Sequence, residues 1–385
     1  MSVAVDQVAQ MIEKAAPKAW AETWDNVGLL VGSGAAKVNK ILLTLDGTPE
    51  VVREAVEMGA QLIVAHHPLI FEPLKNLRAD NRAAEVPIRL LRQDIAYYAA
   101  HTNLDQSGLS SSRMIGQGLS LQEMEILAPT GKEGFYKLVV FVPPEAEEEV
   151  RKALAREGAG KYPADGEAGG GHYEECFFAA QGTGMFRALP GADPYIGAPG
   201  ELTKTPEIRL ESIVAEAAVG RVIRALRRAH PYEEPAYDII PLHSLGQQRG
   251  YGVIGRLQTP LPLKELAAAL AQLPFFQGQE REVRGAIRVA GNAERSVKKV
   301  AILNGGGGSF VRKALFKGAE VLLTGDVDHH AALEALAAGM AVVDMGHYYS
   351  ETPMLHSLAA HLRQEPALRQ TEILLSEIKT YPWKH

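Results

Sequence analysis

The chain has 385 residues, a formal net charge of −6 at pH 7 with neutral histidines, and one cysteine, Cys176. The length suggests two or three domains, and the lone cysteine excludes an internal disulfide framework and fits a reducing, cytoplasmic location. The chain has no basic excess to neutralise phosphates and no run of about twenty apolar residues, so nucleic acid is an unlikely partner and a membrane span is not expected.

The first part of the chain alternates predicted helices with short apolar strands. Thr48 and Pro49 are typical of a helix start, which places a helix between two of these strands. The expected helices cover 3–15, 49–58, 84–92 and 110–118, and the expected strands cover 40–46, 61–65 and 95–100. Strands that alternate with helices of this length favour βαβ units and a parallel sheet.

Histidines follow two of these strands at the point where each strand ends. His66 and His67 precede Pro68, which cannot continue a strand ladder, and His101 and Asp105 follow the next strand. The carboxyl ends of strands in such sheets face the crevice where ligands bind. A lone histidine there is more often a hydrogen-bonded structural residue, but a doublet followed by a second His/Asp pair favours metal ligation.

The stretch from Trp20 to Gly32 contains Trp24, Asp25 and Asn26 before an apolar run, which predicts a shaped loop leading into a short strand. One interpretation is a lip over the site. A packed tryptophan beside a turn is the more common use of such residues.

The pattern changes at about Leu127. The next segment predicts strands at 135–142, 173–181, 208–214 and 236–241 and helices at 144–157 and 215–229, with Gly- and Pro-rich loops at 166–171 and 182–199. The order β-α-β-β-α-β is that of a ferredoxin-like module. We therefore expect three parts: an N-terminal α/β lobe at 1–127, an inserted ferredoxin-like α+β domain at 128–250, and a C-terminal α/β lobe at 251–385.

The last part returns to βα units. Helices are expected at 264–273, 310–317, 330–338 and 351–363, and strands at 298–303, 321–324, 341–344 and 373–375. The predicted fold class is α/β, with two related α/β lobes around a central cleft and the inserted domain between them.

Strand ends in both lobes carry polar residues that suit a metal centre. His347 and Glu351 are four residues apart at a helix start, so both lie on one helix face. Together with His66, His67 and Asp105 they offer three imidazoles and two carboxylates, enough for two divalent ions. This mixed set suits Zn, Fe, Mn, Co or Ni. The remaining candidates, for positioning or proton transfer, are His101, Asp326 and His330.

Three other features have a structural and a functional interpretation. The turn at 304–309 could cradle an anion with its backbone amides, although a tight turn is as good an explanation. The stretch at 230–235 is polar, and a turn between helix and strand is the preferred interpretation. Cys176 precedes two phenylalanines and is expected to be inert.

The chain resembles the Nif-three-like dinuclear metal-centre proteins, commonly labelled GTP cyclohydrolase 1 type 2. The stretches that carry this resemblance are Trp24-Asp25-Asn26-Val27-Gly28-Leu29, His66-His67-Pro68-Leu69-Ile70-Phe71, His101-Thr102-Asn103-Leu104-Asp105, Thr324-Gly325-Asp326 with His330, and Gly346-His347-Tyr348-Tyr349-Ser350-Glu351. The resemblance implies a dinuclear site made of His66, His67, Asp105, His347 and Glu351, and a toroidal homohexamer.

The segment 128–250 resembles the CutA/PII-like domain of longer members of that family. The matching stretches are Phe141-Val142-Pro143, Gly158-Ala159-Gly160, Gly191-Ala192-Asp193-Pro194-Tyr195-Ile196-Gly197 and His230-Pro231-Tyr232-Glu233-Glu234. The chain departs from this pattern after Gly160, where Lys161 to Gly171 form a longer, glycine-rich link.

The resemblance implies a hydrolase with a small-molecule substrate, GTP or another nucleotide. Metal-activated water would attack the guanine ring and formate would be released, with His101 or His330 transferring protons. Two alternatives stay open. The first is a metal-dependent phosphoesterase, because two-metal sites also support that chemistry. The second is a metal-binding regulatory protein without turnover.

Overall fold

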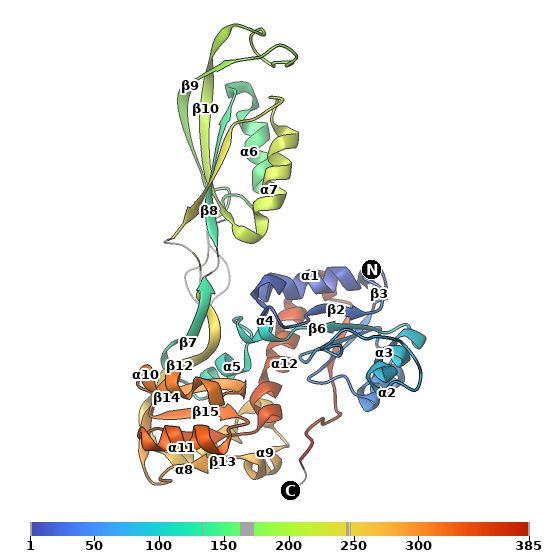
Figure 1. Ribbon diagram of the computed structural model, residues 1–385, viewed down its shortest axis with the longest axis vertical. Helices are drawn as coiled ribbons and strands as arrows, with labels where there is room; N and C mark the ends of the chain where they lie inside the picture. Colours follow the sequence, from blue (N-terminus) through green and yellow to red (C-terminus); the bar gives the residue numbers. More distant parts are fainter. Residues whose placement is uncertain (1, 133, 162–172, 244–245, 247, 384–385) are drawn as a thin grey trace. The chain divides into compact units, whose positions relative to one another are not determined.

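The computed structural model describes residues 2–132, 134–161, 173–243, 246 and 248–383, and these form two compact units (Figure 1). Unit 1 contains residues 1–130 and 249–385, and unit 2 contains residues 131–248. Unit 1 is therefore assembled from both ends of the chain. None of the described helices has the length and apolar character needed to cross a membrane.

The first lobe of unit 1 is a five-stranded sheet in the order β17-β4-β5-β6-β2. Its strands are β2 (Gly28–Val31), β4 (Lys40–Thr44), β5 (Leu62–Ala65), β6 (Ala96–Ala99) and β17 (Glu372–Leu375). Strands β17, β4, β5 and β6 are parallel, whereas β2 is antiparallel to β6. The two-residue strands β1 (Val3–Ala4) and β3 (Lys37–Val38) form a separate pair.

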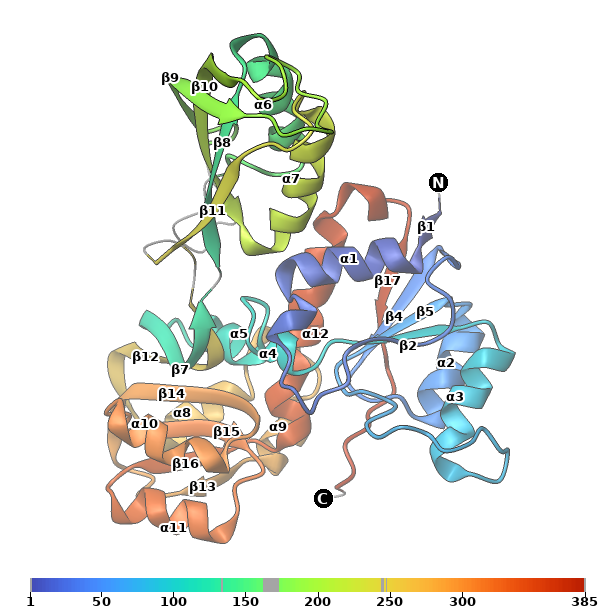
Figure 2. The ribbon, with the colours of Figure 1, turned by 45° about the horizontal axis from the view of Figure 1, so that its top comes forward.

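Helices cover both faces of this sheet (Figure 2). One face packs on α1 (Val5–Ala15) and α12 (His347–Gln364), and the other on α2 (Pro49–Met58) and α3 (Arg82–Arg92). All four residues of β5 and all four of β6 are buried, because helices cover both faces of the sheet. This burial explains why both strands are continuous apolar runs in the sequence. Thr48 caps α2 by accepting from the Val51 N–H at 3.3 Å.

The second lobe is a six-stranded sheet in the order β13-β16-β15-β14-β12-β7. Its strands are β7 (Gln122–Lys132), β12 (Gln248–Pro262), β13 (Arg288–Ala290), β14 (Ser296–Gly306), β15 (Val321–Gly325) and β16 (Ala341–Asp344). Strands β14, β15 and β16 are parallel. One face packs on α5 (Ser111–Gly118), α8 (Leu263–Leu270) and α9 (Glu280–Ala286), and the other on α10 (Val311–Phe316) and α11 (His329–Ala337).

Helix α12 joins the two lobes of unit 1 (Figure 1). Its C-terminal half contributes Met354, Leu358 and Leu362 to the core of the first lobe, whereas Tyr349 near its start belongs to the core of the second. The start of α12 therefore lies where the two sheets meet. The short α4 (Thr102–Asp105) follows β6. Single 3-10 turns occur at Lys18–Trp20, Pro144–Ala146, Pro274–Phe276, Gly308–Phe310 and Pro366–Leu368.

Unit 2 is an antiparallel four-stranded sheet in the order β11-β8-β10-β9. Its elements follow the order β8 (Phe135–Val142), α6 (Glu147–Arg156), β9 (Phe177–Arg187), β10 (Leu202–Ala215), α7 (Glu216–Ala229) and β11 (Tyr237–Leu242). Both helices pack on one face, against a core that includes Leu138, Val140 and Leu210. The ferredoxin-like and CutA/PII-like assignment of this unit stays a prediction.

The α/β class with helix-flanked sheets is confirmed, and most predicted elements are present within a few residues. Five strands and two helices were not predicted: β1, β3, β7, β12, β13, α4 and α9. Strand β12 contains three glycines and two prolines and has an irregular register between Arg256 and Leu261, and glycine and proline argue against a strand. Strands β9 and β10 are also longer than predicted, and the glycine-rich loop at 166–171 lies outside the described residues.

Replacing Leu43 by alanine is expected to lower the free energy of unfolding of unit 1 by about 2–5 kcal/mol, because a fully buried β4 side chain would leave a cavity. Urea unfolding followed by circular dichroism measures the change. Leu333→Ala is the matched control, since that α11 side chain is 51% exposed. An equal effect of the two substitutions would contradict this account of the core.

Candidate metal centre

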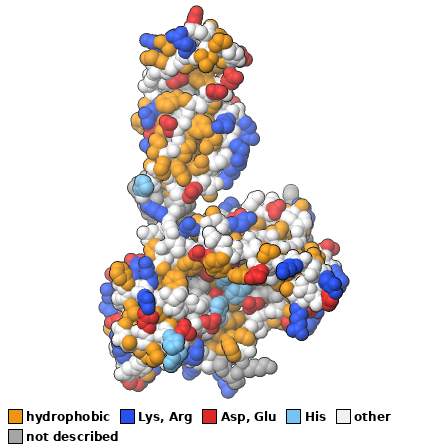
Figure 3. Space-filling view, viewed as in Figure 1, with side chains coloured by type: hydrophobic (Ala, Val, Ile, Leu, Met, Phe, Trp, Pro, Cys, Tyr) orange, Lys and Arg blue, Asp and Glu red, His pale blue; other side chains and the backbone are white. Residues whose placement is uncertain are grey.

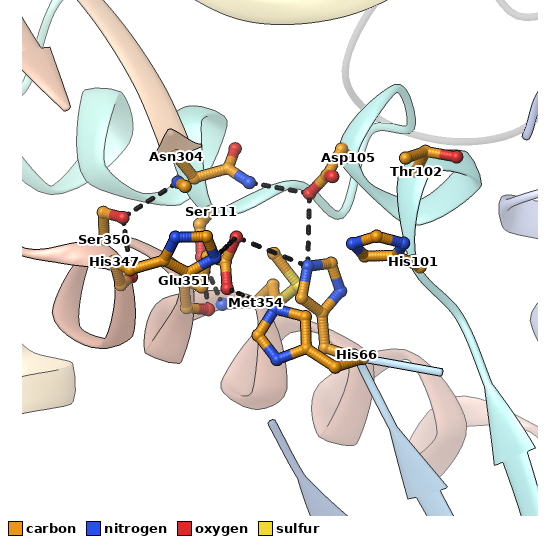
Figure 4. Close-up of polar contacts among 12 residues, drawn as sticks. His66, His101, Thr102, Asp105, Ser111, Asn304, His347, Ser350, Glu351 and Met354 are labelled. Carbon is orange, nitrogen blue, oxygen red and sulfur yellow. Dashed lines mark hydrogen bonds and ion pairs between the residues drawn. The ribbon is translucent and has the colours of Figure 1, made fainter. Parts of the chain in front are cut away.

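Four histidines and two carboxylates meet where the two lobes of unit 1 face each other. His66 and His67 follow β5, His101 precedes α4 and Asp105 ends it, and the start of α12 carries the remaining pair, His347 and Glu351 (Figure 4). Figure 3 shows histidine side chains beside acidic ones in the hollow between the lobes. The ends of short apolar strands and the start of one helix thus bring these side chains to one place.

Glu351 is the centre of this cluster. Its side chain is 4% exposed, and three imidazole Nε2 atoms lie around its carboxylate. The Nε2 atoms of His67 and His347 are each 3.1 Å from a carboxylate oxygen, and that of His66 is 3.6 Å away. The His347 contact comes from the four-residue spacing on α12.

The opposite ring nitrogen, Nδ1, of each histidine is held by an oxygen atom. Nδ1 of His66 bonds the Ala100 carbonyl at 2.9 Å. The other three Nδ1 atoms contact carboxylates: His67 with Asp46 at 2.8 Å, His101 with Asp25 at 2.9 Å, and His347 with Asp326 at 2.8 Å. This arrangement fixes each ring and directs Nε2 away from the contact, as is usual for histidines that bind metals.

Asp105 is buried beside His66, with 3.7 Å between its Oδ1 and Nε2 of His66. The Asn304 side-chain amide donates to the same Oδ1 at 2.6 Å. Asn304 is itself fixed by Ser112, whose hydroxyl donates to its side-chain oxygen and accepts from its backbone N–H. The second lobe, through the end of β14, thereby positions a carboxylate of the first.

Hydrogen bonds from the second lobe shape the start of α12. The Ser111 hydroxyl donates to the Glu351 carbonyl and accepts from the Met354 N–H, next to Pro353, which has no N–H to donate. Gly305 has a φ of +68°, and a Cβ there would lie 2.6 Å from Oε1 of Glu351. The Gly305 N–H donates to the Ser350 hydroxyl, and the Gly307 N–H donates to the Gly325 carbonyl. These amides of the turn at 304–309 are therefore engaged with neighbouring parts of the chain, which favours the tight-turn interpretation over an anion site.

The charges of the metal-free cluster are strongly coupled. Burial lowers the pKa of His67, but Asp46 and Glu351 together raise it to about 10. Glu351 and Asp326 raise the pKa of His347 to about 9. Burial alone would raise the pKa of Glu351, yet the surrounding histidines hold it well below its usual value. Burial raises the pKa of Asp105.

The donor set fits divalent metal ions. Two groups of described residues have possible ligand atoms within 4.8 Å of one another, namely His66, His67 and His101, and His67, His347 and Glu351. Nε2 of His66 and Oε2 of Glu351 are buried and form no hydrogen bond of good geometry among the described residues, although Oε2 lies 3.1 Å from Nε2 of His67. Buried polar atoms are rarely left so, and an ion between them would satisfy both.

The structure brings most of the residues singled out in the sequence to this place, and leaves one outside. His330 is exposed on α11 and belongs to neither group. His101 belongs to the first of these groups, and Asp326 contacts Nδ1 of His347. Three residues were not assigned a role in the sequence: Asp25, Asp46 and Asn304. Asp46 follows strand β4, so the strand-end signal that selected Asp105 could have found it.

An exposed aromatic pair lies beside the cluster. The side chains of Trp24 and Phe71 are 57% and 52% exposed, and their ring centroids are 5.8 Å apart. The Trp24 ring is also 6.1 Å from the His101 ring. Asp25 next to it is held at a pKa of about 2, because hydrogen bonds from His101 and Thr102 outweigh the effect of burial. The stretch from Trp20 to Gly32 therefore forms a turn, but its tryptophan is exposed beside the site instead of being packed.

Comparisons with known proteins place the chain in a family. Residues 3–382 match the model of Duf34/NIF3 (NGG1p interacting factor 3). A Bacillus subtilis protein named GTP cyclohydrolase 1 type 2 homolog is 40% identical over 347 residues, which cover 90% of this chain and 89% of that protein. A protein of the same name from Halalkalibacterium halodurans is 38% identical and covers 98% of this chain and 97% of its own length.

Solved structures agree with this placement. A Bacillus cereus protein related to NIF3 superposes with a TM-score of 0.85 at 36% identity, with 100% of both chains covered. A Staphylococcus aureus protein superposes with a TM-score of 0.73 at 26% identity, covering 100% of this chain and 99% of its own.

Metal affinity is expected to rise with pH. With pKa values of about 10 and 9, His67 and His347 are protonated at neutral pH in the metal-free protein, and metal ions bind only the neutral imidazole. Binding therefore releases at least these two protons, and two released protons make the affinity rise about 100-fold per pH unit below these pKa values. Competition between the protein and a chelator for Co²⁺, measured over a pH series, gives the slope.

His347→Ala is expected to lower that slope by a factor of about ten per pH unit, because one of the released protons is then missing. His329→Ala is the matched control, since this neighbouring histidine on α11 is exposed and lies outside both groups. An affinity of the wild-type protein that does not change with pH would show that metal binding does not displace protons from His67 and His347.

Proposed function

The chain belongs to the Duf34/NIF3 family, and from this premise we propose that it is a metal-dependent hydrolase with a dinuclear centre between the two lobes of unit 1. The proposed metal ligands are His66, His67, Asp105, His347 and Glu351. The proposed ions are divalent, of the Zn, Fe, Mn, Co or Ni class that mixed imidazole and carboxylate ligands suit.

The observation that carries the proposal is the convergence of three imidazole Nε2 atoms on the buried carboxylate of Glu351, within 3.1–3.6 Å. Two buried polar atoms of this cluster, Nε2 of His66 and Oε2 of Glu351, form no hydrogen bond of good geometry among the described residues. Such atoms are rare, and a bound metal ion would satisfy both. When bound, two divalent ions supply the Lewis acidity that lowers the pKa of a water and stabilises developing negative charge.

We assign proton transfer to His101. Its Nδ1 is 2.9 Å from Asp25, which stays ionised because its pKa is about 2, so the ring keeps its proton on Nδ1. Nε2 is then the atom that accepts a proton and returns it. His330, which is exposed and outside the cluster, has no part in this assignment.

The proposed reaction is hydrolytic opening of the guanine ring of GTP with release of formate, a substrate class taken from the name of the relatives. Trp24 and Phe71 support a planar substrate, because exposed aromatic rings beside the cluster can stack on a base. The family resemblance further implies a homohexamer, and the single cysteine fits a cytoplasmic protein.

The test combines metal content with formate release from GTP, on full-length wild type, His347→Ala and the control His329→Ala. His347 is 39% exposed at its side chain, so its removal is expected to spare the fold. Wild type and control should hold about two ions per chain. His347→Ala should lose metal and at least about 100-fold in formate release.

Other outcomes select among the alternatives. Bound metal with phosphate release, but no formate release, would replace the proposed reaction by phosphoester hydrolysis. Bound metal with neither product would indicate a metal-binding regulatory protein. A wild-type protein that binds no divalent ion would overturn the proposal.

Trp24→Ala is expected to raise the KM for GTP about tenfold with a smaller change in kcat, because stacking of a base on an aromatic ring contributes about 1–3 kcal/mol. Steady-state kinetics of formate release measure both constants. Phe316→Ala is the control, since that α10 side chain is 88% exposed. An unchanged KM in the Trp24 variant would remove the stacking role.

A further inference from the structure

Unit 2 contains a cavity of about 940 Å³ that is separate from the cluster of unit 1. The end of β9, the connection between β9 and β10, and the turn after α7 line it. Two stretches that the sequence sets some 40 residues apart thereby meet: residues 191–197 and residues 230–234. A cavity of this size can enclose a small organic molecule.

Aromatic rings form part of the wall. The Tyr232 ring lies 6.3 Å from the Phe186 ring and 6.0 Å from the Tyr195 ring, as centroid distances. The turn that carries Tyr232 is fixed, because Nε2 of His230 donates to the Phe141 carbonyl at 2.9 Å and Nδ1 accepts from the Tyr232 N–H at 3.1 Å. The Tyr195 side chain is 52% exposed, so an aromatic face is available to a ligand.

Carboxylates supply the charge of the wall. Glu207, Glu233 and Glu234 line the cavity, and none of them forms an ion pair with a lysine or arginine among the described residues. Among the described residues, Glu207 accepts from the Tyr232 hydroxyl at 3.0 Å, and Glu233 from the Asp193 N–H at 3.2 Å. The three carboxylates outnumber the two arginines of the wall, so the lining residues carry a formal charge of −1.

Two arginines also line the wall. Arg209 pairs with Glu211 at 2.7 Å, and Arg187, whose guanidinium keeps its charge, donates to the Gly200 carbonyl at 2.6 Å. An anionic ligand would thus face three glutamates against these two arginines. Hard metal ions prefer a shell of oxygen ligands and gain less from aromatic faces.

The sheet leaves space for Glu207. Leu210 faces the helices, and residues of odd number on β10, Glu207 and Arg209 among them, lie on the opposite face beside Phe141. A Cβ at Gly184 would lie 2.2 Å from Oε2 of Glu207. The absence of a side chain there is what lets the carboxylate lie over β9, next to the aromatic rings.

We propose that unit 2 binds a small organic cation, of the alkylammonium or polyamine type, in this cavity. The faces of Tyr195, Tyr232 and Phe186 attract the cation and its methyl or methylene groups, and the ring quadrupole favours positive charge over the ring. Glu207 supplies the opposite charge at the edge of the rings. Apolar walls with a few convergent polar groups are typical of ligand pockets.

Isothermal titration of the full-length protein at low salt tests the proposal with two cationic probes, tetramethylammonium and spermidine, and with uncharged tert-butanol as a probe of similar shape. At least one cation is expected to bind and tert-butanol is not. The two arms separate a methylated ammonium ligand from a polyamine. Binding of neither cation up to about 10 mM, or equal binding of tert-butanol, would overturn the proposal.

Two variants place the binding in this cavity. Glu207→Gln removes the charge and keeps the shape, and it should weaken cation binding at least about tenfold. Tyr195→Ala should weaken tetramethylammonium binding similarly, and its exposed position spares the fold. Glu201→Gln is the control, because this exposed glutamate of the same connection does not line the cavity. Equal affinities of Glu207→Gln and the control would reject the site.

Discussion

A buried carboxylate stays ionised only when positive charge surrounds it, and Glu351 imposes this condition on unit 1. Removing a carboxylate from water costs several kcal/mol unless partners compensate. Here the partners are imidazoles from the end of β5 and from the same turn of α12. The cluster thus depends on α12 starting where the two sheets meet, which its packing against both cores secures.

The groups behind the imidazoles turn this charge balance into a directed site. Aspartates from the first lobe hold His67 and His101, and Asp326 from the second lobe holds His347. With Nδ1 engaged, each ring has one orientation, and its Nε2 is left free for the role proposed for that ring. Both lobes must therefore be folded and docked before the donor set exists. This requirement explains why the polar residues of two separate sheets are gathered at one rim.

Unit 2 offers a different set of side chains, which suits a different class of ligand. Its sheet is covered by helices on one face, and its cavity combines aromatic rings with three glutamates that outnumber the two arginines of the wall. Imidazoles and carboxylates in unit 1 suit divalent metal ions, whereas rings and carboxylates in unit 2 suit an organic cation. The two units can therefore bind chemically distinct ligands without competing for them.

Local sequence determined where each polar group stands on its own element. Apolar runs that stop at His66 and His101, and the four-residue spacing of His347 and Glu351, are short-range properties that backbone geometry converts directly into strand ends and one helix face. Only tertiary structure decided which groups face each other: Asp25 lies 76 residues from His101, and His330 follows a suitable strand yet remains exposed. The same holds for the cavity of unit 2, whose two motifs read separately as a loop and a polar turn. The physical reason is that spacing sets direction within an element, whereas the distance between elements depends on how whole sheets and helices pack.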